Sequence, residues 1–476
     1  MFKNISGSGA GLTLPVDNLR KMVRRLENWP RSCFVLTNLK AMPTALMSNE
    51  CVVPRFLNWA GFSVVVIFLV LGLIVDKLAG IGFHLLLAVS IVSILICGST
   101  GISSFLASVR RYWPLHAAMC MFFVSVAINK ALIGGGSVKD FNFALRFSAF
   151  VFFLWLFLQF DRRQFRILGL VFAVAALAIM VKTYVITDGG VQRGYQNFMP
   201  ILAFTEIGAI LGGLAVLSAK WDGQGTFGAT MLVRSIKVAA CLAGFYSIYL
   251  YQSRGALLAV PLLVIMISVG MMPSVKAGKK ALLAVLMLSI VASGYLATES
   301  VRQRIAQAQS DVSALRKGEG LETPLGVRYQ LWRGSMQIFR ENMLVGVGGN
   351  GYTNALEDLV KRKELTPDAA TFPHSHNEFL FTAVIFGMLG ILTLLAMYFV
   401  PAGFFFRHIR RGPAPKRAAA TMGILLCFCY LLDGLVDVMF IWRECGIFFT
   451  IVLALLVAAV SRFDAEQDSS NLRPGV

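Results

Sequence analysis

Charged residues are scarce in this sequence. Only 14% of its 476 residues are Asp, Glu, Lys or Arg, whereas 57% are hydrophobic. Soluble domains carry about 25% charged residues, so this composition excludes an ordinary soluble protein and predicts an integral membrane protein. The net charge of +19 would suit a nucleic-acid partner, but membrane proteins collect Lys and Arg in cytoplasmic loops. No basic run here is long enough to argue otherwise, so we expect no nucleic-acid partner.

Several familiar sequence signals are also missing. The eight cysteines form no CxxC pair, and the sequence has no DxD motif. No cluster of carboxylates and histidines is expected on the outer side, so we predict metal-independent chemistry without a cofactor. Residues 1–54 lack the short apolar core of a cleavable signal peptide. Residues 19–26 instead predict a basic amphipathic helix on the inner leaflet, or alternatively a disordered basic tail.

Long apolar runs dominate the rest of the chain. A helix needs about 20 apolar residues to cross the hydrocarbon of a bilayer. Twelve such spans are expected near 57–76, 79–98, 114–131, 143–160, 165–184, 198–218, 233–251, 255–272, 281–298, 377–400, 418–437 and 445–461. The fold class is therefore an all-α polytopic membrane protein with about twelve transmembrane helices.

The loops between the spans set the expected orientation. Alternate short loops are rich in Lys and Arg, which places both termini in the cytoplasm. Spans one to nine then occupy 55–298 and spans ten to twelve occupy 377–461, between a cytoplasmic N-terminal segment (1–54) and a polar cytoplasmic tail (462–476). One large periplasmic loop, 299–376, connects spans nine and ten.

This loop is long enough to contain helices, which we expect near 299–317, 326–342 and 353–363. The stretch "GVGGNGY" resembles a nucleotide-binding glycine loop, but no βαβ unit surrounds it. Gly346–Gly351 is better interpreted as a tight turn with positive φ, and it could border a sugar groove.

Three arginines on the outer side go against the orientation signal. Arg193 lies in "GGVQRGYQN", Arg254 in "YQSRGALLAV" and Arg328 in "GVRYQLW". A guanidinium group is always charged and binds diphosphate oxygens in a bidentate manner. The alternative is an interfacial arginine that extends towards the headgroups of membrane lipids.

Two of the five histidines, His374 and His376, precede the tenth span in "PHSHNEF". A neutral imidazole can act as a general base near neutral pH, and nearby arginines would keep it neutral. The alternative is a histidine that caps the helix. Helical spacing places Gly387 and Gly390 below His376, which predicts a closely packed helix face. Glu378 is expected to point elsewhere, as a first-turn charge favoured by the helix dipole.

Two carboxylates, Asp433 and Asp437, lie one turn apart near the outer end of span eleven. They could help to bind a sugar acceptor. An ion pair with an arginine such as Arg443 is the favoured interpretation.

Together these motifs resemble the O-antigen ligases, in the superfamily that includes O-antigen polymerases and O-linked protein oligosaccharyltransferases. Ligases carry a histidine followed by Asn, Ser or Gln, nine further residues and Gly-x-x-Gly. This motif selects His376 over His374, because the first glycine of the motif would fall on Ile385 if it began at His374. The residues that match this motif are His376, Asn377, Gly387 and Gly390. Two further superfamily motifs are "SRGALL" at 253–258 and "RYQLW" followed by the Gly346–Gly348 turn. Arg193 before Asn197 and Pro200 matches a third motif, although its spacing departs from the superfamily pattern.

The resemblance implies an inverting glycosyl transfer at the periplasmic face of the bacterial inner membrane. The donor would be a polysaccharide on undecaprenyl diphosphate and the acceptor a hydroxyl of lipid A–core. His376 would deprotonate or orient the acceptor, Arg193 and Arg254 would hold the diphosphate, and Arg328 would join them or secure the loop. His374, Asn377 and Asn197 are supporting candidates.

Two alternatives stay open. An O-antigen polymerase or a protein O-oligosaccharyltransferase would share the donor chemistry and differ in acceptor. A flippase or transporter for lipid-linked sugars would bind its substrate near the membrane midplane. The candidate polar residues cluster at one face instead, which disfavours transport.

Overall fold

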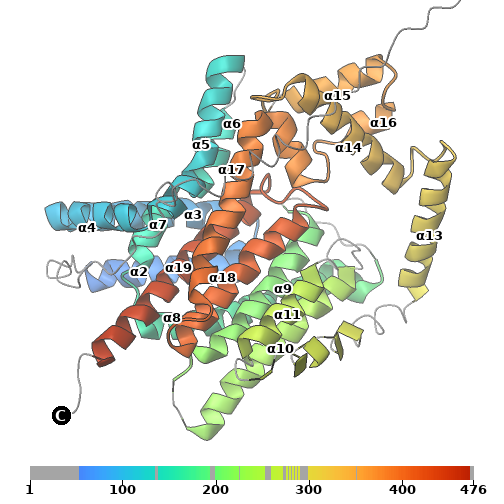
Figure 1. Cartoon of the computed structure of the whole chain (residues 1–476). Helices are drawn as coiled ribbons and strands as arrows, with labels where there is room; N and C mark the ends of the chain where they lie inside the picture. Colours follow the sequence, from blue (N-terminus) through green and yellow to red (C-terminus); the bar gives the residue numbers. More distant parts are fainter. Residues whose placement is uncertain are drawn as a thin grey trace, which may run out of the picture. The chain divides into compact units, whose positions relative to one another are not determined.

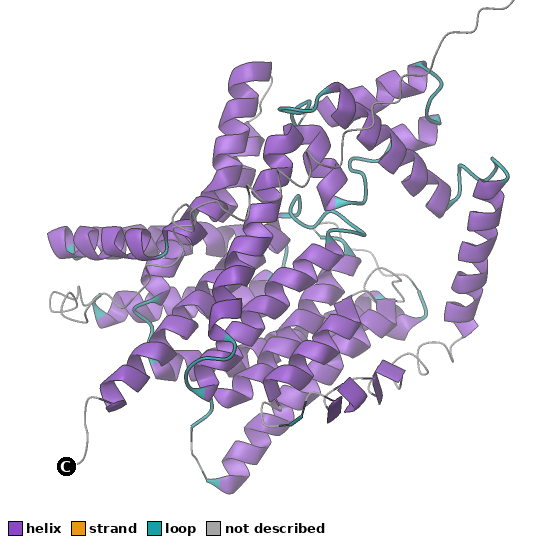
Figure 2. Ribbon diagram, viewed as in Figure 1, coloured by secondary structure: helices purple, strands orange, loops and turns teal. Residues whose placement is uncertain are grey.

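The computed structural model describes residues 53–134, 138–192, 199–223, 226–251, 259–271, 299–349 and 351–471, with short pieces between 275 and 289. The described residues form helices and loops without any strand (Figure 2). This agrees with the predicted all-α class, because a helix satisfies its backbone polar groups within one segment and can cross lipid. The predicted basic helix near residues 19–26 lies outside the described residues.

The helices follow one another along the chain as labelled in Figure 1. In order they are α2 (Arg55–Ile67), the π-helix η3 (Phe68–Gly72), α3 (Leu78–Ile96), α4 (Gly98–Arg111), α5 (Trp113–Ile133), α6 (Val138–Ser148), α7 (Phe150–Phe157), α8 (Arg162–Ile186), η4 (Asp188–Gly190), α9 (Ile201–Leu217), η5 (Ser218–Lys220), α10 (Phe227–Tyr251), α11 (Ala259–Met271), α13 (Glu299–Arg316), α14 (Pro324–Glu341), α15 (Gly351–Lys361), α16 (Pro367–Ala370), α17 (Glu378–His408), α18 (Ala414–Asp433) and α19 (Arg443–Asn471).

Ten helical stretches among the described residues are long and apolar enough to cross a membrane. They coincide with predicted spans one to seven and ten to twelve. The eighth span contains the shorter apolar helix α11, and most of the ninth lies outside the described residues. The fourth span consists of two helices, α6 and α7, and α4 is an additional helix that the hydropathy pattern did not predict.

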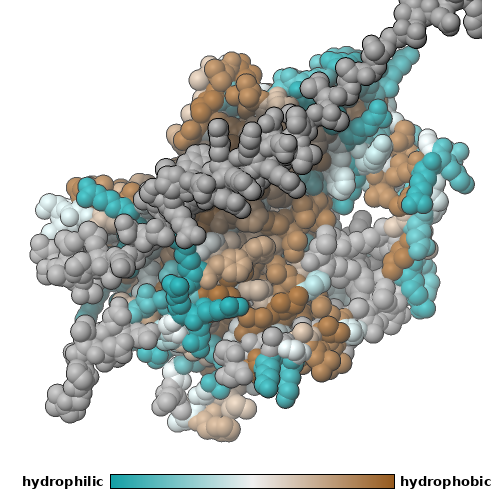
Figure 3. Space-filling model, viewed as in Figure 1, coloured by the Kyte–Doolittle hydropathy of each residue, from teal (hydrophilic) through white to brown (hydrophobic). Residues whose placement is uncertain are grey.

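The core and the outer surface of the bundle are both apolar. α9 is buried along its whole length between neighbours that include α8, α10 and α18. Other helices expose large apolar side chains, such as Leu95, Val185 and Leu242, each more than 60% exposed. Lipid, unlike water, favours such a surface. Figure 3 shows hydrophobic residues over much of this face and hydrophilic ones gathered around α13 and α15.

The helices expected in the predicted periplasmic loop are present as α13, α14 and α15, with α16 in addition. We call α14–α16 the cap. Its small core is formed by Leu331, Ile338, Leu356 and Leu359, all almost completely buried. α14 and α15 also contact α17, so that the cap lies beside the start of that helix (Figure 1).

The loop from α14 to α15 is joined to α17 at a break in that helix. Gly387 has φ 63° and ψ −153°, which is not helical. Around it, Val347 N–H donates to Val384 (2.8 Å), Gly348 N–H to Ile385 (3.0 Å), and Met388 N–H to Met343 (2.8 Å). Backbone groups of the loop therefore replace part of the hydrogen bonding that the break removes.

The expectation of positive φ in the glycine turn is confirmed, since Gly346 and Gly348 have φ 69° and 78°. The prediction of close packing at Gly387 is confirmed, but the helix is not continuous there and the packing partner is a loop rather than another helix. A Cβ atom on Gly387 would lie 2.5 Å from the carbonyl carbon of Leu344. The glycine is required because the loop backbone occupies that space and because φ is positive.

Candidate functional site

Two loops meet at the start of α17. The first, Pro373–Asn377, precedes the helix, and the second, 434–442, connects α18 to α19. Asn377 caps α17, because its Oδ1 accepts the N–H of Leu380 (2.9 Å), and its Nδ2 donates to the carbonyl of Leu435 (3.0 Å). Asn377 therefore fixes the start of the helix and the second loop together.

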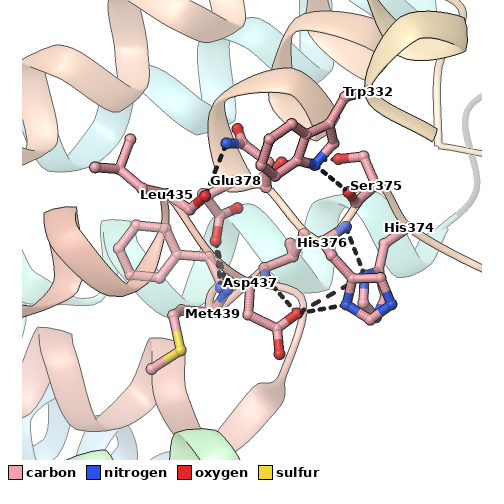
Figure 4. Close-up of polar contacts among 11 residues, drawn as sticks. Trp332, His374, Ser375, His376, Glu378, Leu435, Asp437 and Met439 are labelled. Atoms are coloured by element: carbon pink, nitrogen blue, oxygen red, sulfur yellow. Dashed lines mark hydrogen bonds and ion pairs between the residues drawn. The ribbon is translucent and has the colours of Figure 1, made fainter. Parts of the chain in front are cut away.

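Glu378 strengthens this connection between the two loops. Its side chain is buried, and its Oε2 accepts the backbone N–H groups of Met439 (2.6 Å) and Phe440 (2.9 Å) (Figure 4). Its own N–H donates to the carbonyl of Gly434 (2.7 Å). Glu378 lies in the first turn of α17 as predicted, but its side chain also binds the second loop. There the carboxylate satisfies two buried backbone N–H groups.

The loop held by Glu378 presents Asp437 to His376. Oδ1 of Asp437 lies 3.2 Å from Nδ1 of His376, and also accepts the N–H of Val438 (2.9 Å). An ionised carboxylate can only accept, so Nδ1 carries the proton and Nε2 keeps a free lone pair. Burial alone would raise the pKa of Asp437, but the hydrogen bond and charge of His376 outweigh it and hold that pKa below its ordinary value.

The favoured interpretation of Asp437 as the partner of Arg443 is therefore wrong. Arg443 contacts Glu444 (2.6 Å) and Asp76 (3.6 Å) instead. Asp437 lies just beyond the end of α18, in a bend of the second loop where its N–H still donates to the carbonyl of Asp433 (2.9 Å) and its side chain contacts His376.

The backbone of His376 is in the left-handed region, with φ 50°. This conformation is uncommon for a residue with a side chain and persists when its surroundings determine it. Here Trp332 Nε1 of α14 donates to the carbonyl of Ser375 (3.0 Å), and Ser375 Oγ donates to the carbonyl of Asn377 (2.8 Å). The histidine is thus fixed from both sides, by the cap and by α17.

His374 lies beside His376, with ring centroids 4.5 Å apart. Its Nδ1 accepts the backbone N–H of His376 (3.3 Å). Burial, the charge of His376 and the charge of Arg328 lower the pKa of His374 to about 4, although Asp437 opposes the shift. His374 is therefore neutral at neutral pH, and its 3.9 Å approach to Asp437 is not an ion pair.

Among the described residues, His374, His376 and Asp437 also form a group that could hold a metal ion. One donor atom from each lies within 4.8 Å of the others. The expectation that no such cluster of histidines and a carboxylate exists is wrong, because Asp437 joins the histidines across 61 residues of sequence. In the structure these atoms hydrogen-bond to one another or to nearby backbone.

The site unites three of the predicted residues, His376, His374 and Asn377, and the charge of Arg328 helps to lower the pKa of His374. Arg193, Asn197 and Arg254 lie outside the described residues. Spacing along the sequence did not predict the pairing of Asp437 with His376 or the roles of Glu378 and Trp332. The only indication of these contacts in the sequence was the position of Asp437 near the outer end of a span.

Apolar helices long enough to span a membrane, with a partly buried histidine–aspartate pair at the start of α17, define a multi-pass membrane protein with a site suited to proton transfer. Residues 239–395 match the family model described as O-Antigen ligase. The resemblance seen in the sequence is thereby confirmed for residues 239–395, which are similar to the O-antigen ligase family. The matched residues include the cap, His376 and the break at Gly387. The match indicates a membrane enzyme of the ligase or polymerase type.

One curated relative extends the similarity beyond this region. An uncharacterized protein of Haemophilus influenzae is 22% identical over 316 residues, which cover 64% of this chain and 74% of the relative. A stretch of this length necessarily includes helices that can span a membrane.

Proposed function

We propose that this protein is an inverting, metal-independent glycosyltransferase that transfers O-antigen polysaccharide from undecaprenyl diphosphate to lipid A–core. The observation that carries the proposal is the His376–Asp437 pair, with 3.2 Å between Nδ1 and Oδ1. A histidine whose Nδ1–H is held by a carboxylate presents Nε2 as a general base and is stabilised when it becomes charged.

The reaction begins when Nε2 of His376 takes the proton of the acceptor hydroxyl. The acceptor oxygen attacks the anomeric carbon on the side opposite the diphosphate, and a new C–O bond forms. The bond between that carbon and the diphosphate oxygen breaks, and its electron pair leaves with undecaprenyl diphosphate. Attack from the opposite side inverts the anomeric carbon. Asp437 stabilises the imidazolium until the proton is released to water.

The departing diphosphate gains negative charge, which cations in a site of low dielectric stabilise. Arg254 and Arg193 are proposed to bind it, and Asn197 to support Arg193, from their positions in the superfamily motifs. Arg328 contributes a third cation beside His374. A neutral His374 adds no competing charge, and its hydrogen bond with the N–H of His376 helps to orient the base.

We place this reaction at the periplasmic face of the bacterial inner membrane, with both termini in the cytoplasm. The distribution of Lys and Arg in the loops supports this orientation. The lipid carrier would approach through the apolar surface of the bundle, while the acceptor sugar would reach His376 from the aqueous side.

The proposal is tested by transfer with purified protein in detergent, using undecaprenyl-diphosphate-linked polysaccharide and either lipid A–core or a second donor molecule. We expect product with lipid A–core, in the presence and absence of EDTA. Product with the second donor alone would reassign the protein as a polymerase. Activity lost with EDTA and restored by a divalent cation would assign a metal to His374, His376 and Asp437. No transfer without a sealed bilayer would favour a transporter.

A further inference from the structure

The cap contains a cavity that is separate from the histidine–aspartate pair. It has a volume of about 260 Å³ and lies between the C-terminal end of α14 and one face of α15. Its apolar floor includes Ile338, Val347 and Leu359. Two of these, Ile338 and Leu359, belong to the buried core of the cap.

The polar rim offers both donors and acceptors of hydrogen bonds. It is formed by the carboxylates of Glu341 and Asp358, the amides of Asn342 and Asn354, and the guanidinium of Arg362. Such a mixture suits neighbouring hydroxyl groups, each of which donates and accepts. The apolar floor suits the C–H face of a sugar ring.

The charges around the rim are already paired. Arg362 donates to Glu341 (3.3 Å), and Lys361 donates to Asp358 (2.8 Å). The rim therefore carries little net charge to attract an isolated cation or phosphate. Pockets that bury drug-sized ligands have volumes of about 300–1,000 Å³, so the smaller space here suits one or two sugar residues.

We propose that this cavity binds a sugar residue within the polysaccharide of the donor, away from the transferred bond. This inference rests on the proposed function and adds a subsite to it. One exposed subsite binds a sugar weakly, because water competes for the same hydrogen bonds. A repeating polymer, tethered at the active site, presents many copies at high effective concentration. The subsite therefore favours long donors over single repeat units.

Two variants of the rim test the subsite directly, each with a matched control on α15. Asp358→Ala is paired with Glu357→Ala, and Asn354→Ala with Thr353→Ala. All four side chains are exposed, and the two control residues do not line the cavity. Folding of each variant is checked by its melting temperature in detergent.

The first measurement is binding of free polysaccharide, released from the lipid carrier by mild acid, to the full-length protein in detergent. Saturation-transfer NMR gives the Kd. We expect Asp358→Ala and Asn354→Ala to raise the Kd about fivefold, the effect of one lost hydrogen bond, and the controls to leave it unchanged. Absence of binding by the wild-type protein, or equal Kd values in all variants, would overturn the proposal.

The second measurement compares transfer from a single-repeat donor with transfer from a long donor. We expect the two rim variants to raise KM about fivefold for the long donor and to leave kcat and the single-repeat KM unchanged. An equal rise for both donors would also contradict the subsite. Failure of the wild-type protein to transfer from either donor counts against the proposed function. The binding measurement then still tests whether the cavity binds the polysaccharide.

Discussion

Oδ1 of Asp437 lies 3.2 Å from Nδ1 of His376, although 61 residues separate the two in the sequence. Four hydrogen bonds from Asn377 and Glu378 hold the loop of Asp437 against the start of α17. Residues directly after the histidine thus position its partner. The same short stretch of chain supplies the proposed base, the helix cap and the attachment for the carboxylate.

His376→Ala removes the proposed base and is expected to lower kcat by about 10²–10⁴-fold, the usual contribution of general-base catalysis. The protein should still fold, because the ring of His376 is only partly buried. The measurement is in-vitro transfer to lipid A–core. His84→Ala is the control, since His84 is exposed on α3. Near-normal transfer by the His376 variant would remove this residue from the mechanism.

Asp437→Asn keeps the size of the side chain, but the new amide can turn either its N–H or its oxygen towards Nδ1 of His376. The ring can then adopt the tautomer in which Nε2 carries the proton and cannot act as a base. We expect kcat to fall about 10²-fold, and the acid limb of the kcat/KM pH profile to move to lower pH. Asp368→Asn, an exposed change in the cap, is the control. An unchanged pH profile would indicate a purely structural carboxylate.

Glu378 is predicted to position Asp437 through two backbone N–H groups rather than through its charge. Glu378→Gln retains an oxygen that can accept both and should keep transfer within about tenfold of wild type. Glu378→Leu leaves both N–H groups buried without a partner, at about 1–3 kcal/mol each. We expect that variant to lose transfer and to melt at a lower temperature. Equal behaviour of the two variants would contradict a positioning role.

Gly387→Ala tests the joint between the cap and α17. The added Cβ would lie 2.5 Å from Leu344, and alanine rarely adopts φ 63° with ψ −153°. We expect destabilisation of about 3 kcal/mol or more, measured as a lower melting temperature. Gly403→Ala on the same helix is the matched control, because its Cβ would meet nothing within 4 Å. It should stabilise the helix by up to about 1 kcal/mol.

The buried His374 predicts that acid destabilises the site. Its pKa is about 4 in the folded protein against 6.5 ordinarily, so the unfolded chain binds more protons between these values. The free energy of unfolding therefore does not depend on His374 above pH 6.5. It falls as the pH is lowered from 6.5 to 4, by a total on the order of 3 kcal/mol. The facing groups are His376, Asp437 and Arg328. The lowered pKa of Asp437 acts only below this window.

Thermal melting of the detergent-solubilised protein between pH 7 and pH 4.5 measures this effect. His374→Asn should flatten the dependence, because the amide does not titrate. The same slope in wild type and variant would assign the acid sensitivity to other groups.

The sequence predicted most of the spanning helices, because apolar runs of about 20 residues report directly on the bilayer. The helices of the large loop also followed from periodicity. The break at Gly387 did not, because helical spacing assumes that every residue between two positions is helical. One residue with positive φ interrupts the helix, and residue spacing in the sequence does not reveal such a residue.

The site was predictable only in part for a related reason. His376 could be selected from its distance to Gly387 and Gly390. Its contact with Asp437 depends on how the loop after α18 folds back, and that path is fixed by buried backbone hydrogen bonds to Glu378. Such bonds leave no side-chain pattern on the loop itself, so an ion pair with Arg443 was the nearer explanation.

The break in α17 has a mechanical consequence for turnover. The part of α17 before Gly387 is bound by backbone hydrogen bonds to the loop between α14 and α15, and Met388, just after the break, donates to Met343 at the start of that loop. A pull on the cap by a bound polysaccharide would therefore tilt the base and its carboxylate together. The same pull would reach the rest of α17 through Met388.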